Sequence, residues 1–353
     1  MTDPGGVAPR NLTTLQAGRA IAIVLVVLYH NSVAIFAQYW GIKPLGRLFD
    51  FGDSGFYFFF VLSGFIIPYV HHQDLGQPGR VKSFAWKRFC RVYPLYWIVL
   101  VVVLPVFFRA GGVGGGGGIQ PGVILDSIVL LHFVSLQAVI AVSWPLFHGV
   151  LFYLLFCVAI WRVRPGFIVM GVWLALSAVC LATDQSSMLT GFYFSPMNLL
   201  FGFGMAGAWL TRRGAVPMPA ILVLVGVTVF LLAGADQAYW KAIAEDWRTL
   251  IYGLGAMLAI IGVVQLENAG RLTAPAWLRL LGDASYSIFL VHFFVLWFLA
   301  KLAWASGAAR VVPALVAYLA LPCLAIAAGA IFYRAIEVPL VARLGRRISL
   351  ART

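Results

Sequence analysis

Charged residues are scarce in this 353-residue sequence, because Asp, Glu, Lys and Arg together make up only 10% of it. Apolar residues account for 62% of the chain, and its mean hydropathy is +0.94. A water-soluble surface cannot be built from so few charges. The composition therefore excludes a set of soluble domains and predicts an integral membrane protein.

Acidic residues are the scarcer sign, with 12 Asp and Glu against 25 Lys and Arg, so the net charge is +13. A basic balance also occurs in nucleic-acid-binding proteins, where the cations follow one stripe of the surface. Here they stand in short clusters between apolar runs, which is typical of membrane topology. We therefore expect no nucleic-acid partner.

Cysteine is rare as well, and the four cysteines lie in or beside apolar runs (Cys90, Cys157, Cys180 and Cys323). They show no paired spacing and no grouping with histidine, so we expect neither a disulfide framework nor a metal site. An internal repeat is also missing, which weakens the case for a transporter built from inverted repeats.

Apolar runs long enough to cross a bilayer recur along the chain, and a crossing needs roughly 20 residues. They predict an all-α fold, a polytopic membrane bundle of about ten transmembrane helices in one domain over residues 1–353. The first run is longer than the apolar region of a signal peptide and lacks a cleavage site, so we count it as a span. The predicted spans are 15–37, 53–71, 92–109, 145–162, 166–183, 193–211, 219–235, 248–267, 283–301 and 311–333.

One more apolar piece, 122–142, carries Asp126 and His132 and ends in Ser143-Trp144-Pro145. Counting it as a span would invert the rest of the chain and destroy the bias of basic residues toward one side, so we predict that it does not span. With both termini cytoplasmic, the inner connections hold Arg80, Lys82, Lys87, Arg88, Arg91, Arg162, Arg164, Arg212, Arg213, Arg271 and Arg279, and the outer ones only Lys43, Arg47, Arg109, Lys241, Arg248, Lys301 and Arg310.

Three segments outside the spans complete this topology. Residues 1–14 form a short cytoplasmic segment and residues 334–353 a basic cytoplasmic tail. The glycine run 111–118 is predicted to be a flexible outer loop, and it lacks the lysine and the following helix of a phosphate-binding loop. The expected location is the bacterial inner membrane.

The first span contains two ionisable residues, Arg19 and His30. Eleven residues at 100° each return to nearly the same helix face, about 16 Å further along the axis. A charge within a span needs a polar cavity, a protein interior or an anionic partner, so we expect both residues to line one polar path. The alternative is that Arg19 reaches the inner headgroups and His30 caps the outer end of the helix.

A basic cluster, Lys87, Arg88 and Arg91, stands just before the third span. Residues three apart are neighbours on a helix, so Arg88 and Arg91 suit a phosphorylated ligand that approaches from the cytoplasm. Positive-inside anchoring or contact with anionic lipids is the alternative.

Further polar residues accompany the late spans. His292 lies within the ninth span, with Asp283, Ser285, Tyr286 and Ser287 at its cytoplasmic mouth. We expect Glu337, after the last span, to form a salt bridge with a nearby arginine. His132 and His148 lie near the outer face, where a hydroxyl acceptor would arrive.

Five of these segments, in order, resemble the bacterial acyltransferase family 3 of membrane O-acyltransferases. They are LQAGRAIAIVLVVLYH, which holds Arg19 and His30, then GFYFFFVLSGFII, KRFCRVYPLYW, SYSIFLVH and YRAIEVP. The resemblance covers nearly the whole chain. It implies an acyl group, with acetyl expected, transferred from acyl-CoA to a hydroxyl of a surface saccharide or lipid-linked glycan.

The resemblance also implies residue roles: His30 is the essential histidine, Arg19 is paired with it, and Arg88 and Arg91 hold the donor. One departure is Gly149, which stands where the family usually has a glutamate, so either His148 takes over or this member is altered in activity. The candidate catalytic residues are thus His30, Arg19, His148 and His292. The candidate acetyl-CoA-binding residues are Lys87, Arg88, Arg91, Tyr93, Ser285 and Tyr286.

Two alternatives remain open. The intramembrane charges also suit a glycolipid transporter or flippase, in which they form a binding or proton-relay site. A catalytically impaired homologue would account for Gly149.

Overall fold

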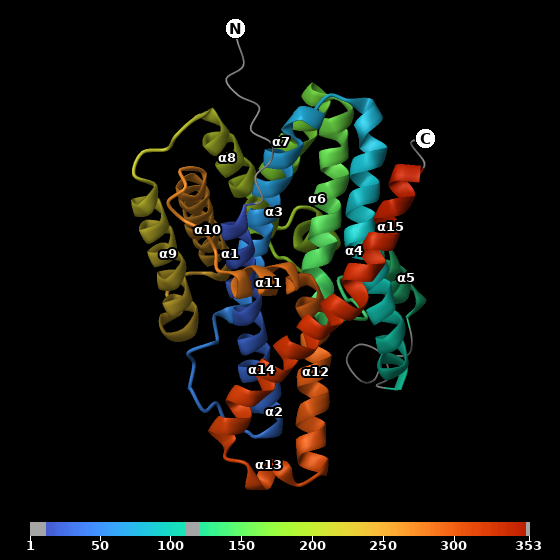
Figure 1. Cartoon of the computed structure of the whole chain (residues 1–353), viewed down its shortest axis with the longest axis vertical. Helices are drawn as coiled ribbons and strands as arrows, with labels where there is room; N and C mark the ends of the chain where they lie inside the picture. Colours follow the sequence, from blue (N-terminus) through green and yellow to red (C-terminus); the bar gives the residue numbers. More distant parts are fainter. Residues whose placement is uncertain (1–11, 110–119, 351–353) are drawn as a thin grey trace.

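The computed structural model describes residues 12–109 and 120–350, and in these ranges the chain forms helices and no strand. The all-α prediction is thereby confirmed (Figure 1). The glycine run 111–118 and most of the segment 1–14 lie outside the described residues. The helices are α1 (Thr13–Tyr29), α2 (Ala37–Tyr39), α3 (Gly55–His71), α4 (Pro78–Arg109), α5 (Pro121–Val129), α6 (Trp144–Trp161), α7 (Val163–Val179), α8 (Leu199–Arg213), α9 (Pro219–Ala235), α10 (Glu245–Asn268), α11 (Ala276–Asp283), α12 (Ser285–Ala305), α13 (Ala308–Val311), α14 (Ala314–Phe332) and α15 (Val338–Leu350).

In the described ranges nine helices, counted with their flanking turns, are long and apolar enough to cross a membrane. They match nine of the predicted spans. The tenth, 193–211, is α8, which has only 15 residues and follows a 3₁₀ turn at Pro196–Asn198. The prediction of a spanning helix there is not confirmed, because part of the apolar run forms this irregular turn and the helix that follows is short.

The apolar piece 122–142 does not span, as predicted. Its helix α5 has nine residues and stops at Leu130, whose φ of 56° is left-handed. Beyond it, the Asp126 carboxylate accepts hydrogen bonds from the backbone N–H groups of Phe133, Val134 and Ser135. Asp126 therefore organises a compact loop, because it satisfies donors that no helix pairs.

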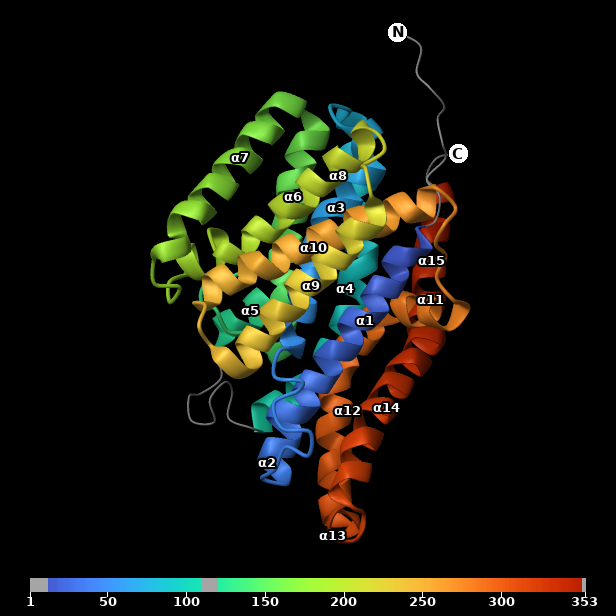
Figure 2. The same cartoon turned by 90° about the vertical axis from the view of Figure 1, so that its left-hand side faces the viewer.

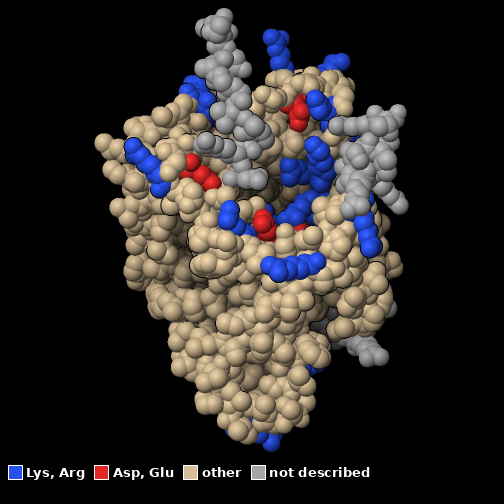
Figure 3. Space-filling model, viewed as in Figure 1, with Lys and Arg blue, Asp and Glu red and all other residues tan. Residues whose placement is uncertain are grey.

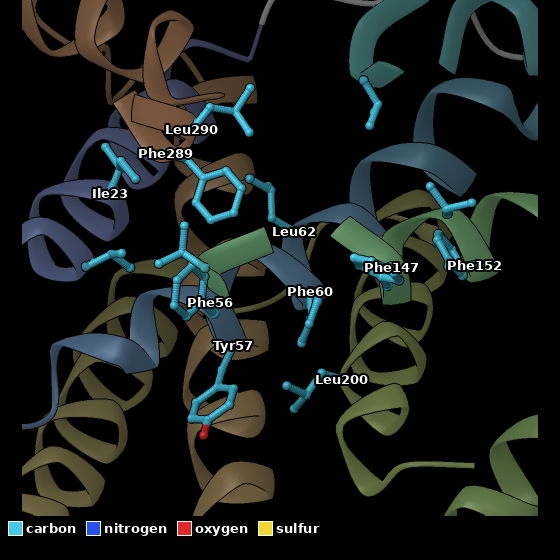
Figure 4. Close-up of a cluster of buried hydrophobic side chains, with 14 of the residues drawn as sticks. Ile23, Phe56, Tyr57, Phe60, Leu62, Phe147, Phe152, Leu200, Phe289 and Leu290 are labelled. Atoms are coloured by element: carbon cyan, nitrogen blue, oxygen red, sulfur yellow. The ribbon is translucent and has the colours of Figure 1, made fainter. Parts of the chain in front are cut away.

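Helices α3 and α8 pack side by side through small residues. A Cβ atom on Gly204 of α8 would stand 2.1 Å from the carbonyl oxygen of Val61 in α3, so only glycine allows this approach. Close backbone contact through small residues is the usual way in which helices associate in lipid. Around this pair lies the aromatic core of Figure 4, where Phe56 and Phe60 of α3 meet Phe289 of α12, a helix far away in sequence.

The two ends of the bundle differ in charge. Figure 3 shows Lys and Arg gathered around a hollow in the upper half of one face, while the lower half of that face is almost free of charge. We call the upper end, where α4 begins and α15 ends, the arginine end (Figures 1 and 2). The opposite end holds the turns after α9 and α12. This one-sided distribution agrees with the charge bias in the sequence.

Candidate active site

Arg19 and His30 both face α12. The Arg19 guanidinium donates to the Ser285 hydroxyl at 2.9 Å, and the His30 ring lies against His292, with Nδ1 and Nε2 separated by 3.2 Å. Ser285 and His292 are themselves two turns apart on α12, so one seam between two helices holds all four side chains. The prediction that Arg19 and His30 share a helix face is confirmed.

The hydrogen bonds determine which nitrogen of each ring carries the proton. His292 Nδ1 lies 2.7 Å from the Phe289 carbonyl oxygen and 3.1 Å from that of Ile288, and a carbonyl only accepts. We therefore assign the proton to Nδ1, which leaves Nε2 of His292 as an acceptor. His30 then donates from its own Nδ1 to that nitrogen and to the Val26 carbonyl oxygen at 2.9 Å. The free lone pair of His30 is consequently on Nε2.

The backbone changes form at His30. Helix α1 ends at Tyr29, and the π-helical turn η1 (His30–Phe36) continues it. π-Helical turns are rare and occur frequently at functional sites. The next residue, Asn31, is fully buried and donates to the Tyr318 carbonyl oxygen of α14 at 3.0 Å. The turn thus gives His30 and its successor separate partners on α12 and α14.

The seam between Arg19 and His30 is packed with apolar side chains. Ile23 and Val26 lie on α1 between them and are fully buried, as is Ile288 on the facing helix. Figure 4 shows Ile23, Phe289 and Leu290 within this packing. The expectation of a polar path along this face is therefore not met, because the two polar pairs close the ends of an apolar contact.

Arg88 is held in a buried network at the arginine end. Its guanidinium donates to His71 Nε2 at 3.0 Å, and His71 Nδ1 in turn donates to Asp74 at 2.7 Å. The rings of Phe84 and Tyr153 lie 5.3 and 5.7 Å from the guanidinium carbon. Its Nε atom is buried without a hydrogen-bond partner among the described residues. Lys87, one position earlier, is exposed.

Arg91 forms an ion pair with Glu337, which confirms the expected salt bridge. Glu337 is 1% exposed, and its second oxygen accepts from the Ser287 hydroxyl at 2.6 Å. Tyr286 lies under the Arg91 guanidinium and donates its hydroxyl to the Val92 carbonyl oxygen. Arg91 therefore joins α4, α12 and the turn before α15, and much of its charge is compensated.

Arg19 connects Arg91 with the seam. Arg91, Asp283 and Glu337 lie close enough to interact electrostatically with it, as does Tyr153. Six of the predicted residues thus gather at the arginine end: Arg19, Lys87, Arg88, Arg91, Ser285 and Tyr286. Tyr93 lies apart from them, because its hydroxyl donates to the Val129 carbonyl oxygen at the end of α5.

His148 occupies a different place in the core. Its Nδ1 donates to the Asn198 side-chain oxygen at 2.9 Å, and the rings of Phe60, Trp144 and Phe192 surround it. The rings of Phe56 and Trp144 lie between His148 and His30. His148 is therefore no direct partner of His30.

Gly149 and His132 complete the outer group of predicted residues. A Cβ atom on Gly149 would meet no atom within 4 Å, so the helix has open space where the resemblance expects a carboxylate. The His132 ring stacks on Phe147, and burial lowers the pKa of His132. Among residues 12–109 and 120–350, no group of three His, Cys, Asp or Glu side chains could hold a metal ion.

Comparisons with known proteins identify the family. A family model described as an acyltransferase domain matches residues 12–334. The chain belongs to this acyltransferase family. It is 30% identical to the exopolysaccharide production protein ExoZ of Rhizobium meliloti (strain 1021) over 319 residues, which cover 85% of this chain and 93% of ExoZ. It is 25% identical to the acyltransferase MdmB of Streptomyces mycarofaciens over 332 residues, 83% of this chain and 82% of MdmB.

The acyltransferase is thus a multi-pass membrane enzyme, since its family is enzymatic and its described helices suit a bilayer. The assignment favours an enzyme over a glycolipid transporter. No solved structure matches the chain.

Two residues of this acyltransferase site were not predicted from the sequence. His71 orients Arg88, and Asn198 orients His148, but nothing in the local sequence of His71 or Asn198 predicts this role. Each closes or opens an irregular turn beside an apolar run, where polar residues are common. Only the meeting of distant helices shows their partners.

Proposed function

We propose that this acyltransferase transfers an acetyl group from acetyl-CoA, bound at the arginine end from the cytoplasm, to a hydroxyl of a saccharide or lipid-linked glycan on the outer side. The enzyme would lie in the bacterial inner membrane with both termini in the cytoplasm. The observation that carries the proposal is the His30 ring, which His292 and the Val26 carbonyl hold with its Nε2 lone pair free.

That arrangement suits general-base catalysis at a hydroxyl. His30 Nε2 takes the proton of the acceptor hydroxyl while its oxygen attacks the thioester carbonyl carbon. The carbon–sulfur bond then breaks, and the departing thiolate takes the proton back from His30, which yields the ester and free CoA. Throughout, the Nδ1–H group of His30 keeps its bond to His292, so His292 acts as a positioning residue.

The arginine end supports the site for the donor. CoA carries several phosphate groups, and arginine and lysine are the usual partners of phosphate. Lys87 is exposed, and Arg88 has no carboxylate partner among residues 12–109 and 120–350, so these two offer more uncompensated charge than Arg91 does. Arg19, Ser285 and Tyr286 lie beside Arg91. Tyr93 stays in the proposed set, and its hydroxyl donates to the Val129 carbonyl oxygen.

The donor arm has to cross part of the membrane. Arg19 and His30 are about 16 Å apart along α1, and the packed seam offers the arm no open route between them. We infer that the arm enters beside this seam, so that binding of acetyl-CoA displaces apolar side chains of the core.

His148 remains a candidate for a second catalytic histidine. Because its Nδ1 donates to Asn198, its lone pair is on Nε2, as it is in His30. His148 is the residue before Gly149, the position at which the family resemblance leads us to expect a carboxylate. The names of ExoZ and MdmB, one linked with exopolysaccharide production and one with acyl transfer, support a saccharide acceptor and this reaction.

The proposal is tested with membranes that contain the wild-type enzyme or its His30→Ala variant. Incubation with radiolabelled acetyl-CoA and host glycan should label the glycan only with the wild type. Glycan mass spectra should show the loss of one acetyl group in cells that carry the variant, at equal protein level. Unchanged acetylation by His30→Ala would contradict the role of His30.

A further inference from the structure

An apolar groove runs along the lipid-facing side of α1, on a different face from Arg19 and His30. It has a volume of about 530 Å³ and lies between α1, α9 and α10. On α1 it extends from Thr14 to Leu25, about 16 Å. Its walls are apolar except for threonines at its upper end, so its chemistry suits a long hydrocarbon chain.

Hydrogen bonds tie the walls of the groove together at both of its ends. At the arginine end, Glu267 of α10 accepts hydrogen bonds from the backbone N–H groups of Thr13 and Thr14, the first residues of α1. At the other end, Gln237 donates to Asp53 at 2.7 Å and accepts from the Tyr252 hydroxyl at 2.9 Å. These contacts fix the spacing of the walls, so the groove is a built feature of the bundle.

A polar pocket of about 360 Å³ lies next to the lower end of the groove. Leu25 lines the groove and Tyr29, one helical turn later, lines the pocket. Likewise Phe51 lines the groove and its neighbour Asp50 lines the pocket. Val33 also lines the pocket. The pocket therefore touches the first membrane segment at Tyr29, one position before His30, and at Val33, three positions after it.

The charges of the pocket favour an anionic head that carries hydroxyl groups. Its lining contains three cations, Arg47, Lys241 and Arg248, and one carboxylate, Asp50. Arg248 pairs with Asp236, and Arg47 with Asp50, whereas Lys241 has no ion pair among the described residues. Lys241 is also held at a left-handed φ of 52°, and such strain clusters at ligand sites.

The surroundings place this pocket at the level of lipid headgroups. Tyr239, Trp240 and Trp247 lie beside it and are exposed. Exposed tryptophan and tyrosine on a membrane protein gather at the interface between hydrocarbon and water. A molecule with its head in the pocket would therefore have its chain at hydrocarbon depth, in the groove.

We propose that the groove and the pocket together bind the acceptor as an anionic glycolipid, a saccharide joined through phosphate to a long apolar chain. The chain enters sideways from the bilayer, the phosphate meets Lys241 and Arg47, and the saccharide comes to lie beside Tyr29, the residue before His30. This inference rests on the proposed function and names the acceptor class of that same site.

Photo-crosslinking tests the inference without turnover. The probe is an alkyl glucosyl phosphate with a diazirine in its chain, and the comparison is a phosphatidylcholine with the same diazirine chain. Both are incorporated into vesicles that contain the His30→Ala protein. We expect the glycolipid probe to label α1 and α9 along the groove, and unlabelled glycolipid to compete it away.

Matched variants locate the binding. Ile21→Trp and Leu231→Trp fill the groove from exposed positions and should lower glycolipid labelling about tenfold, whereas Ile331→Trp, an exposed position on α14, should leave it unchanged. Lys241→Asn removes the charge and tolerates a left-handed φ, so it should weaken binding about fivefold, while Arg310→Asn on α13 should not.

Equal labelling by both probes, or labelling that the Trp variants leave unchanged, would mean that ordinary bilayer lipid fills the groove and would overturn the inference. The two proposals fail separately. Saturable glycolipid labelling without acetyl transfer by the wild type would contradict the proposed reaction alone. Acetyl transfer without groove labelling would contradict the acceptor site alone.

Discussion

His292 Nε2 accepts a hydrogen bond from His30 Nδ1 across 3.2 Å, and this contact joins the first membrane helix to a helix 262 residues further along the chain. It orients a ring that begins a π-helical turn. An aspartate often has this orienting role for catalytic histidines. Here a neutral imidazole, buried among apolar side chains, supplies the acceptor without the cost of burying a charge.

Replacing His292 should slow the chemical step rather than weaken donor binding. We expect His292→Leu to lower kcat by about 10²-fold, with little change in the KM for acetyl-CoA, because His30 loses the acceptor that orients its ring. His292→Gln, whose amide oxygen also accepts, should retain more activity. Steady-state kinetics with purified enzyme measure both values, and a purely structural role would not distinguish Gln from Leu at equal folded protein.

Arg88 should act in donor binding through the orientation that His71 provides. His71→Leu and Arg88→Leu should each raise the KM for acetyl-CoA, by about threefold and tenfold, with kcat nearly unchanged. Arg88→Lys should not restore binding, because lysine lacks the planar guanidinium that lies between Phe84 and Tyr153. Lys82→Leu, at an exposed position of the same helix, serves as control. A fall in kcat alone would contradict this assignment.

The ion pair between Arg91 and Glu337 should respond unequally to loss of either partner. Arg91→Gln leaves a fully buried carboxylate unpaired and should cost about 3 kcal/mol of stability. Glu337→Gln leaves a cation that is 36% exposed and should cost about 1 kcal/mol. Thermal unfolding in detergent measures the order. Equal losses of stability in the two variants would contradict the expectation that the buried Glu337 carboxylate is the more costly partner to leave unpaired.

Gly149 should accept a larger side chain, because a Cβ there meets open space. Gly149→Glu should fold with stability within about 1 kcal/mol of the wild type, whereas Gly204→Ala should be strongly destabilised by its clash with Val61. The acetyl-transfer assay then decides whether the missing carboxylate limits this enzyme. Gain of activity by Gly149→Glu would favour an impaired homologue, and unchanged or lower activity would favour an enzyme that has dispensed with the carboxylate.

Much of the fold could be predicted because bilayer thickness acts on each helix separately. A run such as 248–267 crosses whatever its neighbours are, so local apolarity suffices to find α10. The run 193–211 shows the limit of this reasoning. The turn at Asn198 is held by a hydrogen bond from His148 of a different helix, and the sequence around Asn198 does not reveal that partner.

The positions of Arg19 and His30 on one face of α1 follow from helical periodicity, and the ion pair of Glu337 follows from the cost of an unpaired buried charge. Both were within reach of the sequence. The partners of His30 and Arg88, the packed seam and the lateral groove were decided only by the tertiary structure, because they arise where α1 meets α12, α9 and α10. Side chains from distant segments set the distances there, and no local pattern records them.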